Sequence, residues 1–294
     1  MLNWDDMRVF LAVARAESLS AAAPRLRMDP ATLSRRIARL EAELGQALFL
    51  KSPQGYQLTD LGARMRIEAS EAETAFARAL DAKSEFGAGL SGQIRVGAPD
   101  GCAGFLLPQV CAAIQAENPD LEIQILSLPR VVNLSQREAD MAITVSPPVT
   151  GRYTVQKITD YRLHLAMRRD ANAPRELNDI QDGPVVGYIQ DMIFDKELDY
   201  LDALSSPSVQ LASNSVTVQM QLLQNSGGIG FVHDFALPGF PDLRRVLVDQ
   251  VSLSRSYYLV RHTADRTSER LQKFAEALVR GVQAEVARLE GELP

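Results

Sequence analysis

Six side chains in residues 30–44 are spaced so that one face of a helix could bind an electronegative partner. That face and its two flanks carry small, hydroxyl and guanidinium side chains, namely Ala31, Thr32, Ser34, Arg35, Arg36 and Arg39. Guanidinium groups bind guanine edges and phosphates, and small side chains permit close approach in a DNA major groove. The pattern therefore indicates a DNA-binding helix. A solvated surface helix with a basic face would show the same pattern.

The elements that must position this face follow from the neighbouring residues. The apolar residues of the same segment lie on the opposite side in one narrow stripe, Leu33, Ile37, Leu40 and Leu44. Asp29 and Pro30 are an N-cap acceptor and a first-turn proline, so the helix is predicted to begin at Pro30. One side of this helix is therefore expected to be buried.

Two shorter helices are predicted upstream. Asn3 can cap a helix over residues 4–14, whose apolar stripe consists of Met7, Phe10, Leu11 and Ala14. Ser20 is predicted to cap a second helix over residues 21–26, which would place Pro24 in a first turn, where proline is tolerated. Residues 27–29 then form the turn that leads into the arginine-bearing helix.

A hairpin is predicted after that helix. Residues 48–51 and 57–59 favour extended backbone, and Pro53 with Gly55 marks a tight turn between them. Such a wing contacts the phosphate backbone beside a recognition helix. Its candidate contacts are Lys51, Gln54 and Tyr56.

The order of these segments resembles the DNA-binding head of the LysR-type transcriptional regulators. After a first helix the chain reads SLSAAAPRL, ATLSRRIARLEAELG, LFLK and GYQLTDLG. The resemblance covers roughly residues 1–66 and implies a winged helix-turn-helix. Its implied DNA contacts are Ser20, Pro30, Ala31, Thr32, Ser34, Arg35, Arg36, Arg39, Lys51, Gln54 and Tyr56. Lys51 stands where the family usually has arginine, and Asp29-Pro30 replaces the more usual Ser-Gln, so those contacts differ in this chain.

Composition excludes several classes of protein. The chain has 294 residues and a net charge of −6, but residues 1–66 hold ten Lys/Arg against seven Asp/Glu. A mildly basic head on an acidic body suits site-specific DNA binding rather than non-specific coating of nucleic acid. No nucleophile elbow, Walker loop or HExxH motif is present, and His164, His233 and His262 show no metal-ligand spacing, so we expect no enzyme, cofactor or metal site. No secretion signal or apolar run of ~18–20 residues is visible, so we expect a cytoplasmic protein without membrane contact.

Residues 59–86 are predicted to form a long helix. Apolar residues recur at threes and fours at Leu61, Met65, Ala69, Ala72, Phe76, Ala79 and Phe86, with Lys83 at one seam position. The resemblance implies that this linker helix pairs with its copy in a second subunit; alternatively, the helix packs on its own domain. The predicted domains are residues 1–58, the linker and hinge 59–91, and the body 92–294.

From residue 93 onward, strand and helix patterns alternate. Strands are predicted at residues 93–98, 121–126, 141–145, 163–167, 185–189, 209–211, 229–232 and 257–260, and helices at 105–117, 216–224 and 269–289. This alternation predicts an α/β fold with two doubly wound parallel subdomains, about 92–161 with 267–294, and about 162–266, crossing over near residues 160–162. The architecture resembles the effector-binding part of LysR-type regulators, a fold shared with periplasmic solute-binding proteins.

Ligands in such folds bind at the carboxyl ends of strands, between subdomains. The rule selects Pro99, Asp100, Gly101, Cys102, Ser127, Arg130, Ser146, Ser213, Asn214, Ser215 and His233. The Ser213–Ser215 cluster precedes a helix and either meets a polar or anionic ligand or simply caps the helix. Glycines at 227, 228 and 230 indicate a helix end and sharp return.

Asp100 restricts the charge of the expected ligand. A carboxylate at the mouth of a cleft repels anions, so the ligand is expected to be neutral or cationic, or Asp100 pairs with Arg130 to orient a hydroxyl-bearing ligand. Alternatively, Asp100 caps the helix that follows it. Cys102 is expected in the cleft loop, where it could be oxidised, and Cys111 in the core, so a disulfide between them is disfavoured.

Two functions remain open from the sequence. The resemblance implies a transcription regulator, a homodimer or homotetramer whose heads grip dyad-symmetric promoter DNA. A small-molecule effector of unknown identity would bind between the subdomains and alter recruitment of RNA polymerase. The alternative is a solute-binding or carrier protein with an N-terminal protein-interaction module.

Overall fold

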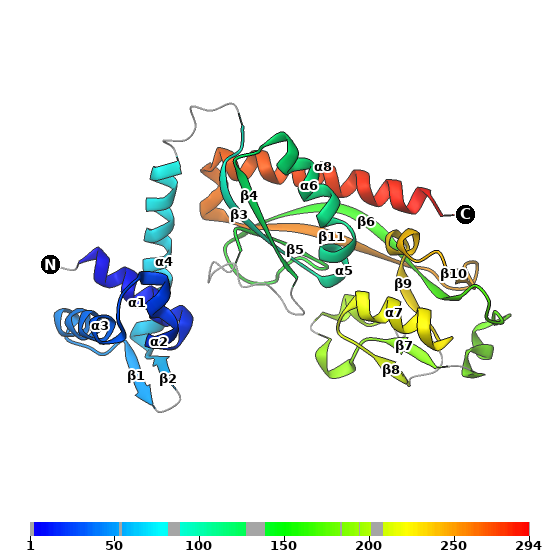
Figure 1. The fold of residues 1–294 in the computed structure, drawn as a ribbon, viewed down its shortest axis with the longest axis horizontal. Helices are drawn as coiled ribbons and strands as arrows, with labels where there is room; N and C mark the ends of the chain where they lie inside the picture. Colours follow the sequence, from blue (N-terminus) through cyan, green and yellow to red (C-terminus); the bar gives the residue numbers. More distant parts are fainter. Residues whose placement is uncertain are drawn as a thin grey trace. The chain divides into compact units, whose positions relative to one another are not determined.

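The computed structural model describes residues 3–52, 55–81, 89–127, 139–182, 184–193, 195–200 and 208–293. The chain divides into two compact units, Met1–Gly87 and Ala88–Pro294. Figure 1 labels the elements of each unit.

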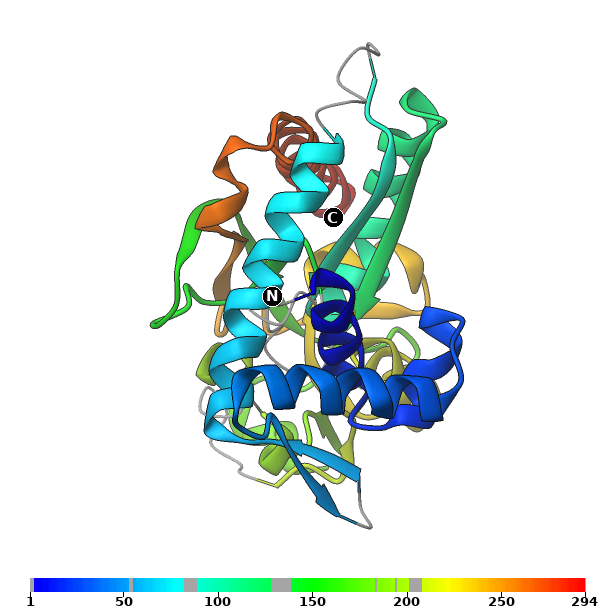
Figure 2. The same cartoon turned by 90° about the vertical axis from the view of Figure 1, so that its left-hand side faces the viewer.

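The first unit is a small helical domain with a two-stranded hairpin. Its elements are α1 (Trp4–Ala16), α2 (Leu19–Leu26), α3 (Pro30–Leu44), β1 (Phe49–Ser52), β2 (Gly55–Leu58) and α4 (Asp60–Asp81). Asn3 and Asp29 cap α1 and α3 as predicted, each accepting a hydrogen bond from a first-turn amide. Figure 2 shows the hairpin at one end of this unit and α4 extending toward the other. The winged helix-turn-helix predicted from the sequence is confirmed.

The start of α2 was predicted wrongly. Ser18, not Ser20, is the N-cap, and its Oγ accepts a hydrogen bond from the Ala21 amide at 3.4 Å. Pro24 therefore lies inside the helix rather than in its first turn, where its missing N–H leaves the Ser20 carbonyl without an intrahelical donor. Both serines are suitable caps by residue type, and spacing alone does not distinguish them.

The two halves of α4 have different surroundings. Leu61 and Met65 pack against the core of the first unit, and Ala69 is buried in it. Ala72 is exposed and Phe76 keeps 59% of its surface exposed. The interpretation that the helix packs on its own domain thus holds for its first half, whereas the second half presents apolar surface. The predicted continuation to Phe86 lies outside the described residues.

The second unit is built on one mixed sheet flanked by helices. Its strands are β3 (Gly92–Ala98), β4 (Leu121–Ser127), β5 (Met141–Thr144), β6 (Tyr153–Arg168), β7 (Val185–Gly187), β8 (Leu211–Ala212), β9 (Ile229–His233), β10 (Leu243–Val246) and β11 (Leu253–His262). Its α-helices are α5 (Asp100–Phe105), α6 (Leu107–Glu117), α7 (Val216–Ser226) and α8 (Glu269–Gly291). The strand order is β4-β3-β5-β11-β6-β9-β7-β8, and β10 pairs with β6.

The sheet is parallel at both ends and antiparallel in the middle. β3 pairs in parallel with β4 and β5, and β7 pairs in parallel with β8 and β9. Between these two groups, β6 and β11 pair antiparallel with each other and with the neighbouring strands. The α/β class is confirmed, but the prediction of purely parallel sheets was wrong, because β6 and β11 pair antiparallel. Residues 160–162, where the chain was predicted to cross over, lie inside the continuous strand β6. The two parallel groups of strands agree with the predicted two-subdomain fold, whereas the predicted bounds of the subdomains stay a prediction.

The closing helix α8 packs on α6, a helix of the first predicted subdomain. The two helices approach closely at Gly281, where an added Cβ would lie 2.5 Å from Cγ1 of Val110. Valine is stiff at χ1 in a helix, so this contact has little room to relax. The glycine therefore sets how near α8 lies to the first group of strands.

We expect Gly281→Ala to destabilise the second unit by about 1–3 kcal/mol through overpacking. The gain of about 1 kcal/mol in helix propensity acts in the opposite direction. Urea unfolding of the full chain measures the net effect. Adding Val110→Ala should recover part of the loss in a double-mutant cycle, and a Gly281→Ala variant more stable than wild type would contradict the packing argument.

Candidate nucleic-acid interface and ligand-binding site

The exposed face of α3 carries a short chain of hydrogen bonds. Asp29 accepts the Thr32 amide at 2.8 Å and the Thr32 hydroxyl at 2.7 Å. The Thr32 hydroxyl oxygen in turn accepts from a terminal nitrogen of Arg35 at 3.1 Å. These bonds from Thr32 lower the pKa of Asp29. They hold the exposed Arg35 guanidinium over the first turn of α3.

The opposite face of α3 is buried through Leu33, Ile37 and Leu40, while Leu44 is half-buried. The predicted orientation of the helix is therefore confirmed. Among the other proposed contacts of the head, Ala31, Pro30 and Ser20 are exposed and Ser34 is half-buried.

Two of the predicted contact arginines are bound to a buried carboxylate. Asp6 on α1 keeps 2% of its surface exposed. Arg39 donates to it from Nε at 2.6 Å and from a terminal nitrogen at 2.5 Å, and Arg36 donates at 3.3 Å. Arg36 and Arg39 thus anchor α3 to α1, so any DNA contact they make must use their remaining N–H groups.

Sequence reasoning missed Asp6. It stands in the first turn of α1, where an acidic residue is common, so its type alone was uninformative. The available signal was its position next to Met7 and one turn before Phe10, on the stripe that faces the core.

Tyr56 supports the wing from beneath. Its ring meets Phe49 edge-on with centroids 5.3 Å apart, and Phe49 lies 5.3 Å from Phe10. The Tyr56 amide also donates to the Glu17 carbonyl at 3.0 Å. Tyr56 is therefore half-buried structural support, and a phosphate contact through its hydroxyl stays a prediction. Lys51 lies in β1, and Gln54 and the side chain of Lys51 are outside the described part.

We expect Asp6→Ala to destabilise the first unit by about 1–3 kcal/mol, because two guanidinium groups lose their buried partner. Urea unfolding of the full chain measures this loss. Asp5→Ala is the matched control, since exposed Asp5 only pairs with Arg8 one turn away and should change stability by less than about 0.5 kcal/mol. Equal effects of both substitutions would show that burial of Asp6 is unimportant.

In the second unit, the predicted cleft loop after β3 is a helix. Asp100 is the first residue of α5, and its carboxylate reaches across to α7. Oδ1 accepts from the Ser127 hydroxyl at 3.0 Å. Oδ2 accepts from the Ser215 hydroxyl at 2.9 Å, the Val216 amide at 2.7 Å and the Thr217 amide at 3.4 Å.

The alternative prediction, that Asp100 caps the helix that follows it in sequence, was wrong. Asp100 instead caps α7, which lies more than 100 residues further along the chain. Ser215 is the N-cap of α7, with its Oγ accepting from the Val218 amide at 3.4 Å, so the capping interpretation of the serine cluster is confirmed. Ser213 accepts from the Ser215 amide at 3.1 Å. Arg130, the proposed partner of Asp100, lies outside the described residues.

The helix α5 packs directly on β9 and α7. A Cβ at Gly101 would lie 3.2 Å from Cε1 of His233 and 3.3 Å from Cγ2 of Val216. Cys102 is fully buried, so its placement in an open loop was wrong. Burial raises the pKa of both thiols, that of Cys111 to about 11, and both cysteines are free. Neither thiol therefore has the exposure or thiolate character of a redox sensor.

The remaining candidates scatter around this contact. Pro99 precedes α5 and Asn214 precedes Ser215, and both are half-buried. Ser146 donates from Oγ to Asp195. The structure thus brings together Asp100, Ser127, Ser215, Gly101 and His233, and it assigns Ser146 to a separate hydrogen bond.

A buried aromatic cluster beside His233 escaped sequence analysis. Tyr161 stacks on Tyr257 with centroids 4.2 Å apart and on His233 at 5.4 Å, and Tyr200 meets His233 edge-on at 6.4 Å. Burial raises the pKa of all three phenols and lowers that of His233 to about 4, so these groups are neutral at pH 7. Within the described residues, Nδ1 of His233 has no hydrogen-bond partner. These side chains come from distant segments, and no spacing in the sequence links them.

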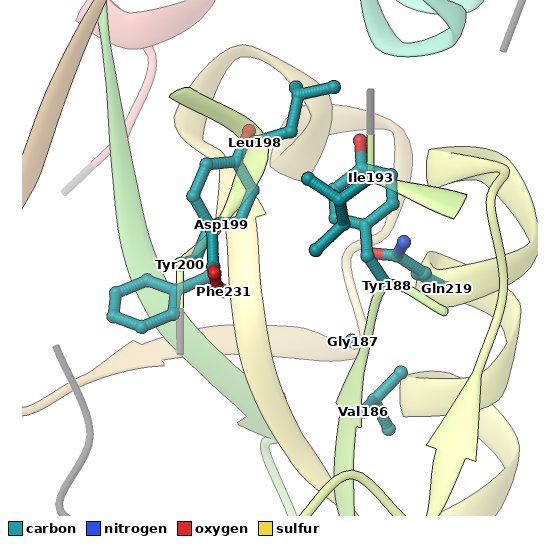
Figure 3. A pocket seen from close by; sticks show the side chains of 9 residues that line it. All are labelled: Val186, Gly187, Tyr188, Ile193, Leu198, Asp199, Tyr200, Gln219 and Phe231. Carbon is teal, nitrogen blue, oxygen red and sulfur yellow. The ribbon is translucent and has the colours of Figure 1, made fainter. Parts of the chain in front are cut away.

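A small pocket adjoins this cluster. Figure 3 shows Tyr200 and Phe231 on one side of it and Tyr188, Ile193 and Gln219 on the other. Its volume of about 10 Å³ is enough for one water molecule. In the part of the chain that the structure describes, no group of three His, Cys, Asp or Glu side chains could hold a metal. No described helix is long and apolar enough to cross a membrane.

Both units match models of known families. Residues 4–63 match the bacterial regulatory helix-turn-helix protein model of the lysR family, and residues 87–283 match the LysR substrate binding domain. The chain is 29% identical to the Mau operon transcriptional activator of Paracoccus denitrificans, covering 60% of this chain and 62% of that protein. It is 26% identical to the HTH-type transcriptional activator TtdR of Escherichia coli, covering 87% and 81%. The match spans 62% of the first of these relatives and about half of the activator IlvY of Salmonella typhimurium, which is 30% identical over 48% of this chain.

Solved structures share the fold. Full-length OxyR C199D from Pseudomonas aeruginosa superposes with a TM-score of 0.75 at 17% identity, covering 98% of this chain and 97% of that one. The Vibrio cholerae virulence activator AphB gives a TM-score of 0.59 at 20% identity, covering 95% and 99%. At these identities the likeness shows the fold alone.

Proposed function

The chain belongs to the LysR family of bacterial regulatory proteins, and we propose on that basis that it is a sequence-specific, DNA-binding regulator of transcription in the cytoplasm. The observation that carries the proposal is the exposed face of α3, where Thr32 and Asp29 position the Arg35 guanidinium. The opposite face is fixed to the domain core, so the helix can enter a major groove without rearrangement. The protein has no catalytic activity of its own in this proposal.

Arg35 reads a base edge, and the wing contacts phosphates. A guanidinium held over the first helical turn suits bidentate bonding to guanine. Lys51 and Gln54 on the hairpin contribute sequence-independent contacts to the backbone. Arg36 and Arg39, whose charges are shared with Asp6, set the angle of α3 and offer their outer N–H groups to phosphate.

The protein acts as a homodimer or a larger homo-oligomer. The exposed Ala72 and Phe76 on the second half of α4 provide an apolar surface for a second copy. Paired heads would bind two half-sites of promoter DNA related by a dyad. A small-molecule effector in the second unit then alters the spacing of the heads and, through it, contact with RNA polymerase.

A gel-shift titration with DNA from upstream of the gene that encodes this chain tests whether the protein is a DNA-binding regulator. A sequence-specific complex at physiological salt supports the regulator. Absence of such a complex across many promoters would favour a carrier protein with an N-terminal interaction module.

We expect Arg35→Ala to weaken binding to the specific operator by about 1–3 kcal/mol and to relax base preference at one position. Fluorescence anisotropy with specific and scrambled duplexes measures both effects. Arg280→Ala, which removes an exposed arginine from α8, controls for the change in net charge. Operator affinity unchanged in Arg35→Ala would mean that the recognition face is placed wrongly.

We expect Ala72→Glu to give monomers, because a charge would be buried in the α4 interface. Light scattering at micromolar concentration reports the mass, and affinity for a two-half-site operator should collapse. A duplex with one half-site is the control, since each head should still bind it as wild type does. A dimeric Ala72→Glu variant would show that the interface does not lie at Ala72 of α4.

A further inference from the structure

Asp100 places a carboxylate of the chain itself at the N-terminus of α7. The amides of Val216 and Thr217 and the hydroxyl of Ser215 all donate to its Oδ2. The N-terminus of a helix attracts anions through its free amides and the helix dipole, and α7 has 11 residues. The position where α7 could hold the carboxylate of a ligand is therefore already filled.

The second oxygen of the same group is also bound. Oδ1 accepts from Ser127 at the carboxyl end of β4, so the carboxylate links three elements, α5, β4 and α7. A second anion could reach these donors only by displacing Asp100 or by lying against its charge. Like charges at contact distance repel even where water partly screens them.

Among the described residues, the imidazole that packs against Gly101 offers an anion no compensating charge. His233, which packs against Gly101, is 4% exposed, and burial lowers its pKa to about 4. Its Nδ1 has no hydrogen-bond partner among the described residues. A neutral imidazole can hydrogen-bond a polar molecule without adding a positive charge, which suits an uncharged ligand better than an anion.

We propose that Asp100 is a built-in anion that fills the carboxylate position of α7, clamps α5 to α7 and excludes carboxylate ligands from this position. The inference rests on the proposed function for its regulatory meaning, because the occupied position lies in the proposed effector-binding unit. Asp100 thereby determines which class of effector this unit accepts: a molecule without a carboxylate directed at α7.

Chemical rescue of Asp100→Ala tests the proposal, with formate as the probe because it matches the deleted group. We expect the melting temperature of the full chain to fall by about 3–6 °C in Asp100→Ala. Formate at 50 mM should restore at least half of the loss, whereas chloride at equal ionic strength and uncharged formamide should not. Wild type should respond equally to formate and chloride. Asp120→Ala, at an exposed turn, is the matched control and should change the melting temperature by less than about 1 °C.

Several results would overturn the proposal. An Asp100→Ala variant as stable as wild type would contradict the claim that Asp100 clamps α5 to α7. Formate that acts no better than chloride would contradict the claim that α7 has a position for an anion. If formate stabilises wild type as strongly as the variant, Asp100 does not exclude carboxylates from this position. If Asp100→Ala does not fold, the isosteric Asp100→Asn should melt below wild type without responding to formate; equal stability would show that the charge is not required.

Binding of operator DNA is measured separately, with no small molecule present. If the head fails to bind DNA, the proposed function is rejected, whereas the conclusion from the formate experiment about Asp100 is unaffected. If formate fails to rescue while operator binding is intact, the built-in anion alone is rejected.

Discussion

A carboxylate wholly or partly removed from water must be met by donors, and this constraint joins distant elements within each unit. Asp6 is met by two arginines of α3, and Asp100 by the N-terminus of α7. A third carboxylate, Asp234, is fully buried; Nδ1 of His164 lies 2.9 Å from it and Arg245 donates to it at 3.2 Å. The contacts of Asp6, of Asp100 and of Asp234 with His164 tie together elements that are far apart in the sequence. The three acids therefore act as fixed points of the tertiary structure.

In the first unit this constraint divides the arginines of α3 by task. Arg36 and Arg39 orient the helix through Asp6, whereas Arg35 bonds within its own helix to Thr32 and leaves its guanidinium exposed. A helix that enters a groove must be held rigidly on one side while its polar groups stay accessible on the other. The basic face of α3 therefore anchors the helix through Arg36 and Arg39 and leaves Arg35 exposed for the proposed DNA contact, although its residue types alone suggest a uniform patch of charge.

This division shows how far the sequence could predict the structure. Caps and three-four spacing are local signals, so α1, α3 and the hairpin were predicted closely, and the strand-end rule gathered Asp100, Ser127 and His233 into one site. The partners of Asp6 and Asp100 lie 33 and 116 residues away, and no local pattern reveals such pairs. The same limit concealed the aromatic cluster around Tyr161 and the continuity of β6. The N-cap of α2 was predicted wrongly for a different reason, because Ser18 and Ser20 are equivalent cap candidates within three residues.

The second unit combines a continuous frame with a breakable contact. β6 and β11 run unbroken between the two parallel groups of strands, so those groups can shift relative to each other only as this ribbon bends or twists. The register of the ribbon shifts between Tyr257 and Tyr258, and such irregularities concentrate local twist. Asp100 joins α5, which follows a strand of the first group, to α7, which precedes β9 of the second. A displacement of the groups at this point must stretch the bonds from Ser215 and Val216 before it deforms the ribbon. The hydrogen bonds of one carboxylate therefore oppose bending of the ribbon at this point.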